Sequence, residues 1–153
     1  MGFKANSGFF KGTYGALKYK LDLQLFSNTK GQMPNFKNAV TPKEKFNNYS
    51  LDFNNPNAVG KAEAYQKGLG YTKNNSASLI KQIHDTVVSG KVKPYDVSVS
   101  QFGTKYKYRI SVTGPNGKTK NVIAVYQIDS GGSIPRLITN YLEAKWWLKN
   151  ILK

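Results

Sequence analysis

Positive charges alternate with apolar side chains along residues 105–113, KYKYRISVT, just before a Gly-Pro-Asn-Gly turn. Successive side chains of a β-strand point to opposite faces, so the lysines and the arginine share one face and the apolar residues share the other. A tight turn through Pro115 and Asn116 would set a second strand beside the first, with Ile123 and Val125 on the apolar face. The basic face is then predicted to carry Lys105, Lys107, Arg109, Lys118, Lys120 and Tyr126.

Such a face suits a nucleic acid, because lysine and arginine neutralise phosphates and a tyrosine ring stacks on a nucleobase. The alternative interpretation is the ordinary solvent-facing side of an antiparallel sheet, on which lysine also blocks edge aggregation. The alternation alone leaves both interpretations open.

The charge balance favours nucleic acid. The 153 residues include 23 Lys+Arg against 8 Asp+Glu, a net charge of +15, and the only arginines are Arg109 and Arg136. An excess of this size repels itself unless a polyanion is the partner. The chain has no cysteine, one histidine and few carboxylates, so we expect neither a metal nor another cofactor. Because no run of 18 apolar residues occurs, we expect no membrane contact.

Hydrophobic periodicity predicts an α+β domain over residues 49–153, in which two helices pack on a four-stranded antiparallel sheet. One helix is expected from near Val59 to Gly70, capped by Asn57, and another over about residues 75–89. The strands are expected at about 95–101, 104–113, 119–129 and 134–141. A short amphipathic helix in the segment LEAKWWLKNILK is expected to close the chain.

The first 48 residues differ in character from this domain. Leucine and tyrosine alternate with polar residues in 17–26, LKYKLDLQLF, which predicts a separate strand within a flexible basic leader. Residues 27–48 are polar, contain two prolines and are interpreted as a linker.

Four segments of the domain, in this order, resemble a known family. They are GKAEAYQKGLGYTKNN (60–75), FGTKYKYRISVTGPNGKTKNV (102–122), AVYQI (124–128) and PRLITNYL (135–142). The order is similar to that of a small toxin-like domain at the C-termini of polymorphic and contact-dependent toxins, also found in phage genomes. That domain resembles the barnase–EndoU–colicin–RelE superfamily of metal-independent ribonucleases.

The resemblance implies RNA cleavage that uses a base, a cationic phosphate clamp and an acid. It carries these roles to Lys61, Arg109, Thr113, Arg136, Thr139 and Tyr141. Arg109 and Arg136 would clamp phosphate, because a guanidinium binds it bidentately. Lys61 would act as base or electrostatic stabiliser, a threonine would position a phosphate oxygen, and Tyr141 would stack or donate a proton. The only histidine, His84, lies on the apolar side of the second helix and is interpreted as structural.

The leader strand separately resembles the N-terminal signature of proteins from head-gene clusters of phages that infect Gram-positive bacteria. A phage product acting in the cytoplasm of its bacterial host is therefore expected. Two alternatives to a ribonuclease stay open: a non-catalytic inhibitor of the anti-CRISPR type, which blocks a Cas effector or its guide or DNA channel, and a virion-associated protein. The expected partners are a nucleic acid, with RNA favoured, a ribonucleoprotein, a host defence protein or an immunity protein.

Overall fold

The computed structural model describes residues 31–143, and the chain divides into two compact units between Pro34 and Asn35. In the first unit, the backbone N–H of Met33 donates a 2.9 Å hydrogen bond to the side-chain oxygen of Gln32. The second unit contains every helix and strand considered below. Within residues 31–143, no helix combines the length and the apolar character needed to span a membrane.

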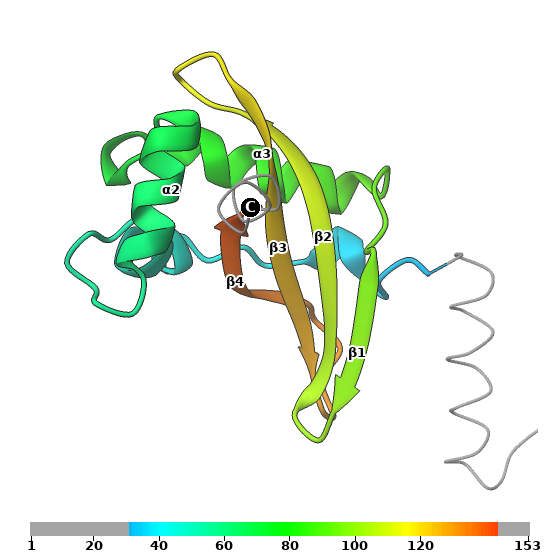
Figure 1. Cartoon of the computed structure of the whole chain (residues 1–153). Coiled ribbons are helices and arrows are strands. Elements are labelled where there is room, and N and C mark those ends of the chain that lie inside the picture. Colours follow the sequence, from blue (N-terminus) through cyan, green and yellow to red (C-terminus); the bar gives the residue numbers. More distant parts are fainter. Residues whose placement is uncertain (1–30, 144–153) are drawn as a thin grey trace, which may run out of the picture. The chain divides into compact units, whose positions relative to one another are not determined.

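Helical segments come first in the second unit and strands follow, as predicted for an α+β domain. The helical segments are η1 (Phe36–Asn38), the π-helical turn η2 (Phe46–Ser50), α2 (Val59–Leu69), η3 (Lys73–Asn75) and α3 (Ser76–Ser89). The strands are β1 (Asp96–Ser100), β2 (Gly103–Thr113), β3 (Thr119–Asp129) and β4 (Arg136–Leu142). They form one antiparallel sheet in the order β1-β2-β3-β4, with α3 behind β2 and β3 and α2 beside β4 (Figure 1).

Both long helices end where a glycine takes a left-handed conformation. Gly70 follows α2 with φ 83°, and Gly90 follows α3 with φ 73°, which is the conformation that glycine adopts at little cost. The start of α2 differs from the prediction. Its N-cap is Ala58, which makes no side-chain cap, while the backbone N–H of Asn57 donates to the side chain of Asn55.

The core lies between the helices and one face of the sheet. The helices bury Ala62, Tyr65, Leu69, Leu79, Ile83 and Val87, which recur at the three- and four-residue spacing of a helix face. From the sheet, Tyr108 and Tyr126 meet edge to face with their ring centroids 6.0 Å apart. The hydroxyl of Tyr65 donates a 2.8 Å hydrogen bond to Asn140 of β4, so this buried polar pair ties α2 to the sheet.

The hairpin between β2 and β3 differs from the prediction by one residue. Its loop runs from Gly114 to Lys118 and pairs Thr113 with Thr119, whereas the expected tight turn would have paired Thr113 with Lys118. Side chains alternate along a strand, so a shift of one residue exchanges the two faces of β3. Ile123 and Val125 therefore lie on the basic face.

The same shift corrects three predictions for the basic face. Tyr126 pairs with Tyr106 on the core face and is fully buried, so its placement beside the lysines was wrong. Lys120 lies opposite the core residue Val112, on the other face from Lys105 and Lys107, and Lys118 lies in the loop.

Residues 35–48 belong to the folded unit, although the sequence predicted a linker there. The backbone N–H of Val40 donates to the carbonyl of Pro135 at 2.8 Å, and Leu137 donates to the carbonyl of Val40 at 2.9 Å. These bonds add a short parallel bridge beside β4. The predicted leader strand at 17–26 lies outside the described residues. So does most of the predicted C-terminal helix, whose first residue, Leu142, instead ends β4.

Candidate functional site on the outer face of the sheet

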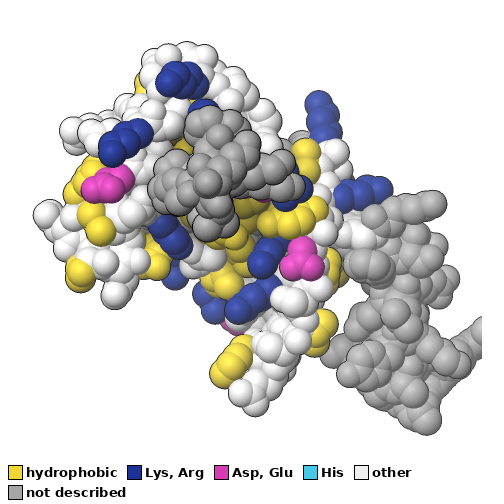
Figure 2. All heavy atoms as spheres, viewed as in Figure 1, with side chains coloured by type: hydrophobic (Ala, Val, Ile, Leu, Met, Phe, Trp, Pro, Cys, Tyr) yellow, Lys and Arg dark blue, Asp and Glu magenta, His cyan; other side chains and the backbone are white. Residues whose placement is uncertain are grey.

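The face of the sheet that points away from α3 is here called the outer face. It carries three rows of side chains that the strand register aligns. The rows are Lys105–Gln127–Arg136, Lys107–Val125–Thr139 and Arg109–Ile123–Tyr141. Neighbouring rows are two residues apart on β2 and β3, or about 7 Å. On β4 a register shift makes the step from Arg136 to Thr139 three residues. Figure 2 shows Lys and Arg side chains beside hydrophobic ones on this side of the sheet. Each row thus combines a cation on β2 with a polar or aromatic residue on β4.

Lys61 reaches the middle of β4 from the first turn of α2. Its Nζ donates a 2.9 Å hydrogen bond to Oγ1 of Thr139. The same nitrogen lies 4.7 Å from the ring centre of Tyr49 and 5.4 Å from that of Tyr141. The ammonium is therefore held by one hydroxyl and two aromatic faces, a setting in which cation–π attraction contributes. Three of the residues that the resemblance singled out, Lys61, Thr139 and Tyr141, meet here.

The surroundings of Lys61 favour its neutral form more than water does. Burial lowers the pKa of Lys61, because removing the ammonium from water penalises the charged state. No carboxylate forms an ion pair with Lys61 among the described residues, whose ion pairs involve other cations. A half-buried lysine without a carboxylate can accept a proton or stabilise an anion that enters the site.

Arg109 occupies the next row and is held by Glu143, just after β4. Its Nε and Nη2 lie 3.0 Å and 2.9 Å from Oε2 of that carboxylate, and Asn121 also donates to Glu143. The guanidinium stacks over the ring of Tyr95 at 4.2 Å. The hydrogen bond to Glu143 raises the pKa of Arg109, so this residue stays charged and is already neutralised by a partner.

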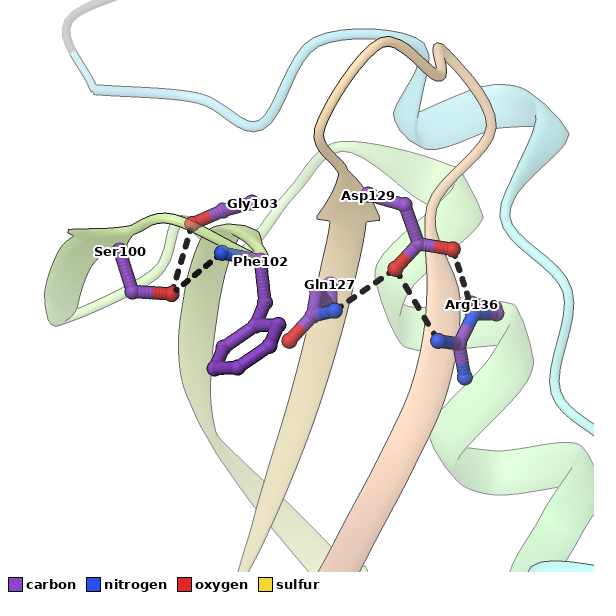
Figure 3. Close-up of polar contacts among 6 residues, drawn as sticks. All are labelled: Ser100, Phe102, Gly103, Gln127, Asp129 and Arg136. Atoms are coloured by element: carbon purple, nitrogen blue, oxygen red, sulfur yellow. Dashed lines mark hydrogen bonds and ion pairs between the residues drawn. The ribbon is translucent and has the colours of Figure 1, made fainter.

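Arg136, at the other end of the outer face, is held in the same way by Asp129. Its Nε and Nη2 donate to the two carboxylate oxygens at 3.1 Å and 3.0 Å, and Gln127 donates to the same carboxylate at 2.6 Å (Figure 3). These hydrogen bonds, led by that of Arg136, hold the pKa of Asp129 below its usual value. The ring of Phe102 projects toward Gln127 in the same view.

The predicted site residues are thus gathered only in part. Arg109, Thr139 and Tyr141 lie in two adjacent rows, and Lys61 reaches this part of the face from α2. Lys105, Lys107 and Arg136 lie on the same face. Thr113 lies two rows beyond Arg109, where its hydroxyl bonds to Thr119 at 2.8 Å and its backbone bonds to Gln82. The structure therefore places Thr113 at the base of the hairpin loop and not beside Lys61.

Three residues of the site were missed by the sequence analysis: Tyr49, Tyr95 and Glu143. Tyr49 lay in the segment just after the expected linker, and Tyr95 at the edge of an expected strand. Glu143 fell in the expected C-terminal helix. Arg109 and Glu143, for example, are 34 residues apart in the chain. A contact between residues so distant in the sequence leaves no local periodicity that could predict it.

His84 lies half-buried on α3, as its place in the sequence predicted. Its Nδ1 lies 2.9 Å from Oγ1 of Thr41, which in turn lies 2.6 Å from the hydroxyl of the buried Tyr126. This chain of hydrogen bonds is on the core side of the sheet, away from Lys61. In residues 31–143, no three His, Asp or Glu side chains come together in a group that could hold a metal ion.

Residues 32–144 match a family described as a domain of unknown function, DUF6883. The chain belongs to this family. The matched region of the DUF6883 domain includes η1, the helices, the sheet and all residues of the outer face. It begins well before residue 49, in agreement with the packing of residues 35–48 against the sheet.

A solved structure shares the fold of this DUF6883 domain. It is a chain of the contact-dependent growth inhibition toxin–immunity protein complex from Klebsiella pneumoniae 342. The TM-score is 0.52 at 18% sequence identity, and the match covers 71% of this chain and 96% of that one. At this identity the likeness establishes the fold alone, and the fold agrees with the resemblance to contact-dependent toxin domains. No curated protein matches the sequence.

Proposed function

We propose that this chain is a toxin-like domain that binds RNA on its outer face and cleaves it with Lys61 as a catalytic residue. The observation that carries the proposal is the setting of Lys61, which is half-buried, hydrogen-bonded to Thr139 and flanked by two tyrosine rings. A structural lysine is usually solvated or paired with a carboxylate, because burying an uncompensated charge costs free energy. When Lys61 carries a proton, a phosphate entering the site would supply the missing negative charge.

The reaction that fits these groups is attack of the ribose 2′-oxygen on the adjacent phosphorus. The bond from phosphorus to the 5′-oxygen breaks, leaving a 2′,3′-cyclic phosphate and a free 5′-hydroxyl. Neutral Lys61 takes the proton of the 2′-hydroxyl, and the hydroxyl of Tyr141 gives a proton to the departing 5′-oxygen. The hydroxyl of Thr139 orients a phosphate oxygen. Exchange with water then restores both protonation states.

The rest of the outer face supplies a path for the RNA strand. Lys107 shares a register row with Thr139, and Lys105 lies one row further along the same face. Tyr95 is 45% exposed beside Arg109 and offers a ring on which a base can stack. Cations spaced along a strand and an exposed ring together favour a single-stranded substrate.

The test is cleavage of tRNA and total RNA by the purified chain in EDTA, with Lys61→Met beside the wild type. The matched control is Lys67→Met, an exposed lysine in the last turn of the same helix. We expect wild type and Lys67→Met to leave 2′,3′-cyclic phosphate ends, and Lys61→Met to lose at least about 100-fold in rate. Cleavage by Lys61→Met at the wild-type rate would overturn the proposed site.

A second candidate function, binding without cleavage, is favoured by the state of the two arginines. Arg109 and Arg136 are the natural clamps for a pentavalent phosphorus, yet each is already bound by a carboxylate. A domain of this kind would grip RNA or a host ribonucleoprotein with its lysines, as an inhibitor of the anti-CRISPR type does. Intact RNA together with a salt-sensitive mobility shift would select this candidate over the ribonuclease.

The proposed toxin-like role also bears on where the protein acts, on its partner and on its origin. RNA as the target would place its action in the bacterial cytoplasm, and a toxic ribonuclease would require an immunity protein in the cell that makes it. The phage origin suggested by the leader resemblance is part of the same proposal. It is compatible with either function, because phages use both toxins and inhibitors of host defence.

A further inference from the structure

The two edge strands of the sheet differ in whether other parts of the domain cover them. The edge formed by β4 is covered, because Val40 bridges its first residues and α2 packs beside it (Figure 1). The opposite edge is β1, which pairs only with β2 among the strands of the described residues. Four of its five residues are exposed and the remaining one, Val97, is half-buried. Most residues of β1 are therefore exposed at this edge of the sheet.

The hairpin geometry shows which backbone groups of β1 point outward. A two-residue loop, Gln101 and Phe102, joins β1 to β2 and pairs Ser100 with Gly103. The closing pair of such a hairpin exchanges both of its backbone hydrogen bonds, and bonded and non-bonded pairs then alternate. It follows that the N–H and C=O groups of Val97 and Val99 point away from β2, where an added strand would meet them.

Natural sheet edges usually carry a lysine, a proline or a bulge that prevents pairing with other chains. The sequence of β1, DVSVS, contains neither lysine nor proline. Instead it presents Val99, which is 79% exposed, and the following loop presents Phe102, which is 67% exposed. An accessible edge with exposed apolar side chains favours strand pairing.

The charges around this edge define the chemistry of what can pair with it. Lys91 and Lys93 lead into β1 and are exposed, and Lys105 and Lys107 lie beside it on β2. The carboxylate among these lysines, that of Asp96, lies 3.9 Å from Nζ of Lys107. Four lysines against one aspartate leave the region positive. An acidic partner is therefore attracted, and a second copy of this basic chain is repelled.

We propose that the β1 edge accepts an extended acidic segment of a partner protein as a fifth strand of the sheet. Strand addition takes its affinity from main-chain hydrogen bonds and its specificity from alternate side chains. Valines of the segment would face the side of Val97 and Val99, and its carboxylates would face the side of Ser98 and Lys105. The proposal does not involve Lys61 and does not depend on ribonuclease activity, although Lys105 and Lys107 also lie on the proposed path of the RNA strand.

The test uses a fluorescent synthetic peptide of about eight residues that alternates valine with glutamate, and the full chain as receptor. Val99→Pro removes an outward-facing N–H while leaving the β1–β2 ladder intact, because proline is tolerated at such edge positions. Val99→Thr is the matched control, since it keeps both the N–H and the branched side chain. A peptide that alternates valine with lysine tests the sign of the charge.

We expect the acidic peptide to bind wild type and Val99→Thr equally, and Val99→Pro at least about tenfold more weakly. The basic peptide should not bind. Amide exchange on the labelled chain should slow in β1 on addition of the acidic peptide, and the melting temperature of Val99→Pro should match that of the wild type. Equal affinity for Val99→Pro would overturn the proposal. So would concentration-dependent self-association that Val99→Pro abolishes, because the occupant would then be a second copy of this chain.

Discussion

Nζ of Lys61 donates a 2.9 Å hydrogen bond to Oγ1 of Thr139 and thereby joins the first turn of α2 to the middle of β4. The two residues are 78 positions apart in the chain. The side chain of Lys61 extends from α2, beside β4, to Thr139 on the outer face of the sheet. A cation in the first turn of a helix opposes the helix dipole, which makes this position unfavourable for lysine on local grounds alone. The contact with Thr139 and the two tyrosine rings offsets that cost.

The first prediction separates the charge of Lys61 from its ability to lose a proton. Lys61→Arg keeps a cation at the site but cannot act as a base, because a guanidinium stays protonated. We expect Lys61→Arg to bind RNA with an affinity within about threefold of wild type and to cleave at least about 100-fold more slowly. Binding is measured by fluorescence anisotropy and cleavage by single-turnover assay. Wild-type cleavage by Lys61→Arg would instead make the residue an electrostatic stabiliser.

The second prediction concerns the carboxylate that holds Arg109. Glu143→Gln removes the negative charge 2.9 Å from Nη2 and releases the guanidinium for phosphate. We expect RNA affinity at low salt to rise about threefold to tenfold, and the slope of log K against log salt to steepen by about 0.7. Asp85→Asn is the control, because this carboxylate pairs with Lys81 on α3, behind the sheet. A gain of equal size in both variants would assign the effect to net charge alone.

The helices, the strands and the polarity of β2 could be predicted from the sequence because they depend on local periodicity. Gly70 stands immediately after Leu69, the last apolar residue of α2, and Gly90 stands two residues after Val88, the last apolar residue of α3; both glycines take the left-handed conformation that such a position predicts. The alternation in residues 105–113 likewise assigned each side chain of β2 to the correct face. The basic side of that strand was therefore predictable in full.

The basic side of β3 was not predictable, because it depends on a single residue in the hairpin loop. A two-residue turn and the observed five-residue loop differ by one position in register, and this difference moves Tyr126 from the outer face to the core. The ion-pair partners of the two arginines could not be predicted from the sequence either. Glu143 is 34 residues from Arg109, so only the folded sheet shows that the guanidinium is already bound.

The third prediction is a pH dependence of stability at Asp129. Hydrogen bonds from Arg136 and Gln127 lower the pKa of this carboxyl below its ordinary value of 3.8. Because the folded-state pKa is lower than the unfolded one, the stabilisation is fully present above about pH 5 and is lost as the pH falls through the folded-state pKa. Asp129→Asn should therefore melt below wild type at neutral pH, and the gap should shrink on acidification below about pH 4.

The measurement for Asp129 is a series of thermal melts at closely spaced pH values. Glu63→Gln serves as the control, because Glu63 is an exposed carboxylate of α2 outside the ion pairs described here. Its difference from wild type should stay small across the range. A constant gap between wild type and Asp129→Asn down to the lowest pH would show that the charge of the carboxylate does not stabilise the fold.

The fourth prediction treats Tyr126 as a structural residue. Its hydroxyl lies 2.6 Å from Oγ1 of Thr41, which lies 2.9 Å from Nδ1 of His84, and burial raises the pKa of Tyr126. A consistent arrangement has Tyr126 donating to Thr41 and Thr41 donating to His84. Thr41→Val leaves the buried tyrosine hydroxyl without this partner and should lower the free energy of unfolding by about 1–3 kcal/mol in urea titrations.

The double variant, which removes both hydroxyls, distinguishes the cost of leaving a buried hydroxyl unpaired from the cost of losing one hydrogen bond. Tyr126→Phe alone should cost about 1 kcal/mol, and adding it to Thr41→Val should cost less than the sum of the two, because no unpaired hydroxyl remains. RNA affinity should be unchanged in all three variants, since Tyr126 lies on the core face and is fully buried. Additive losses would show that the two hydroxyls act independently. A loss of RNA affinity in Tyr126→Phe at unchanged stability would return this tyrosine to the binding surface.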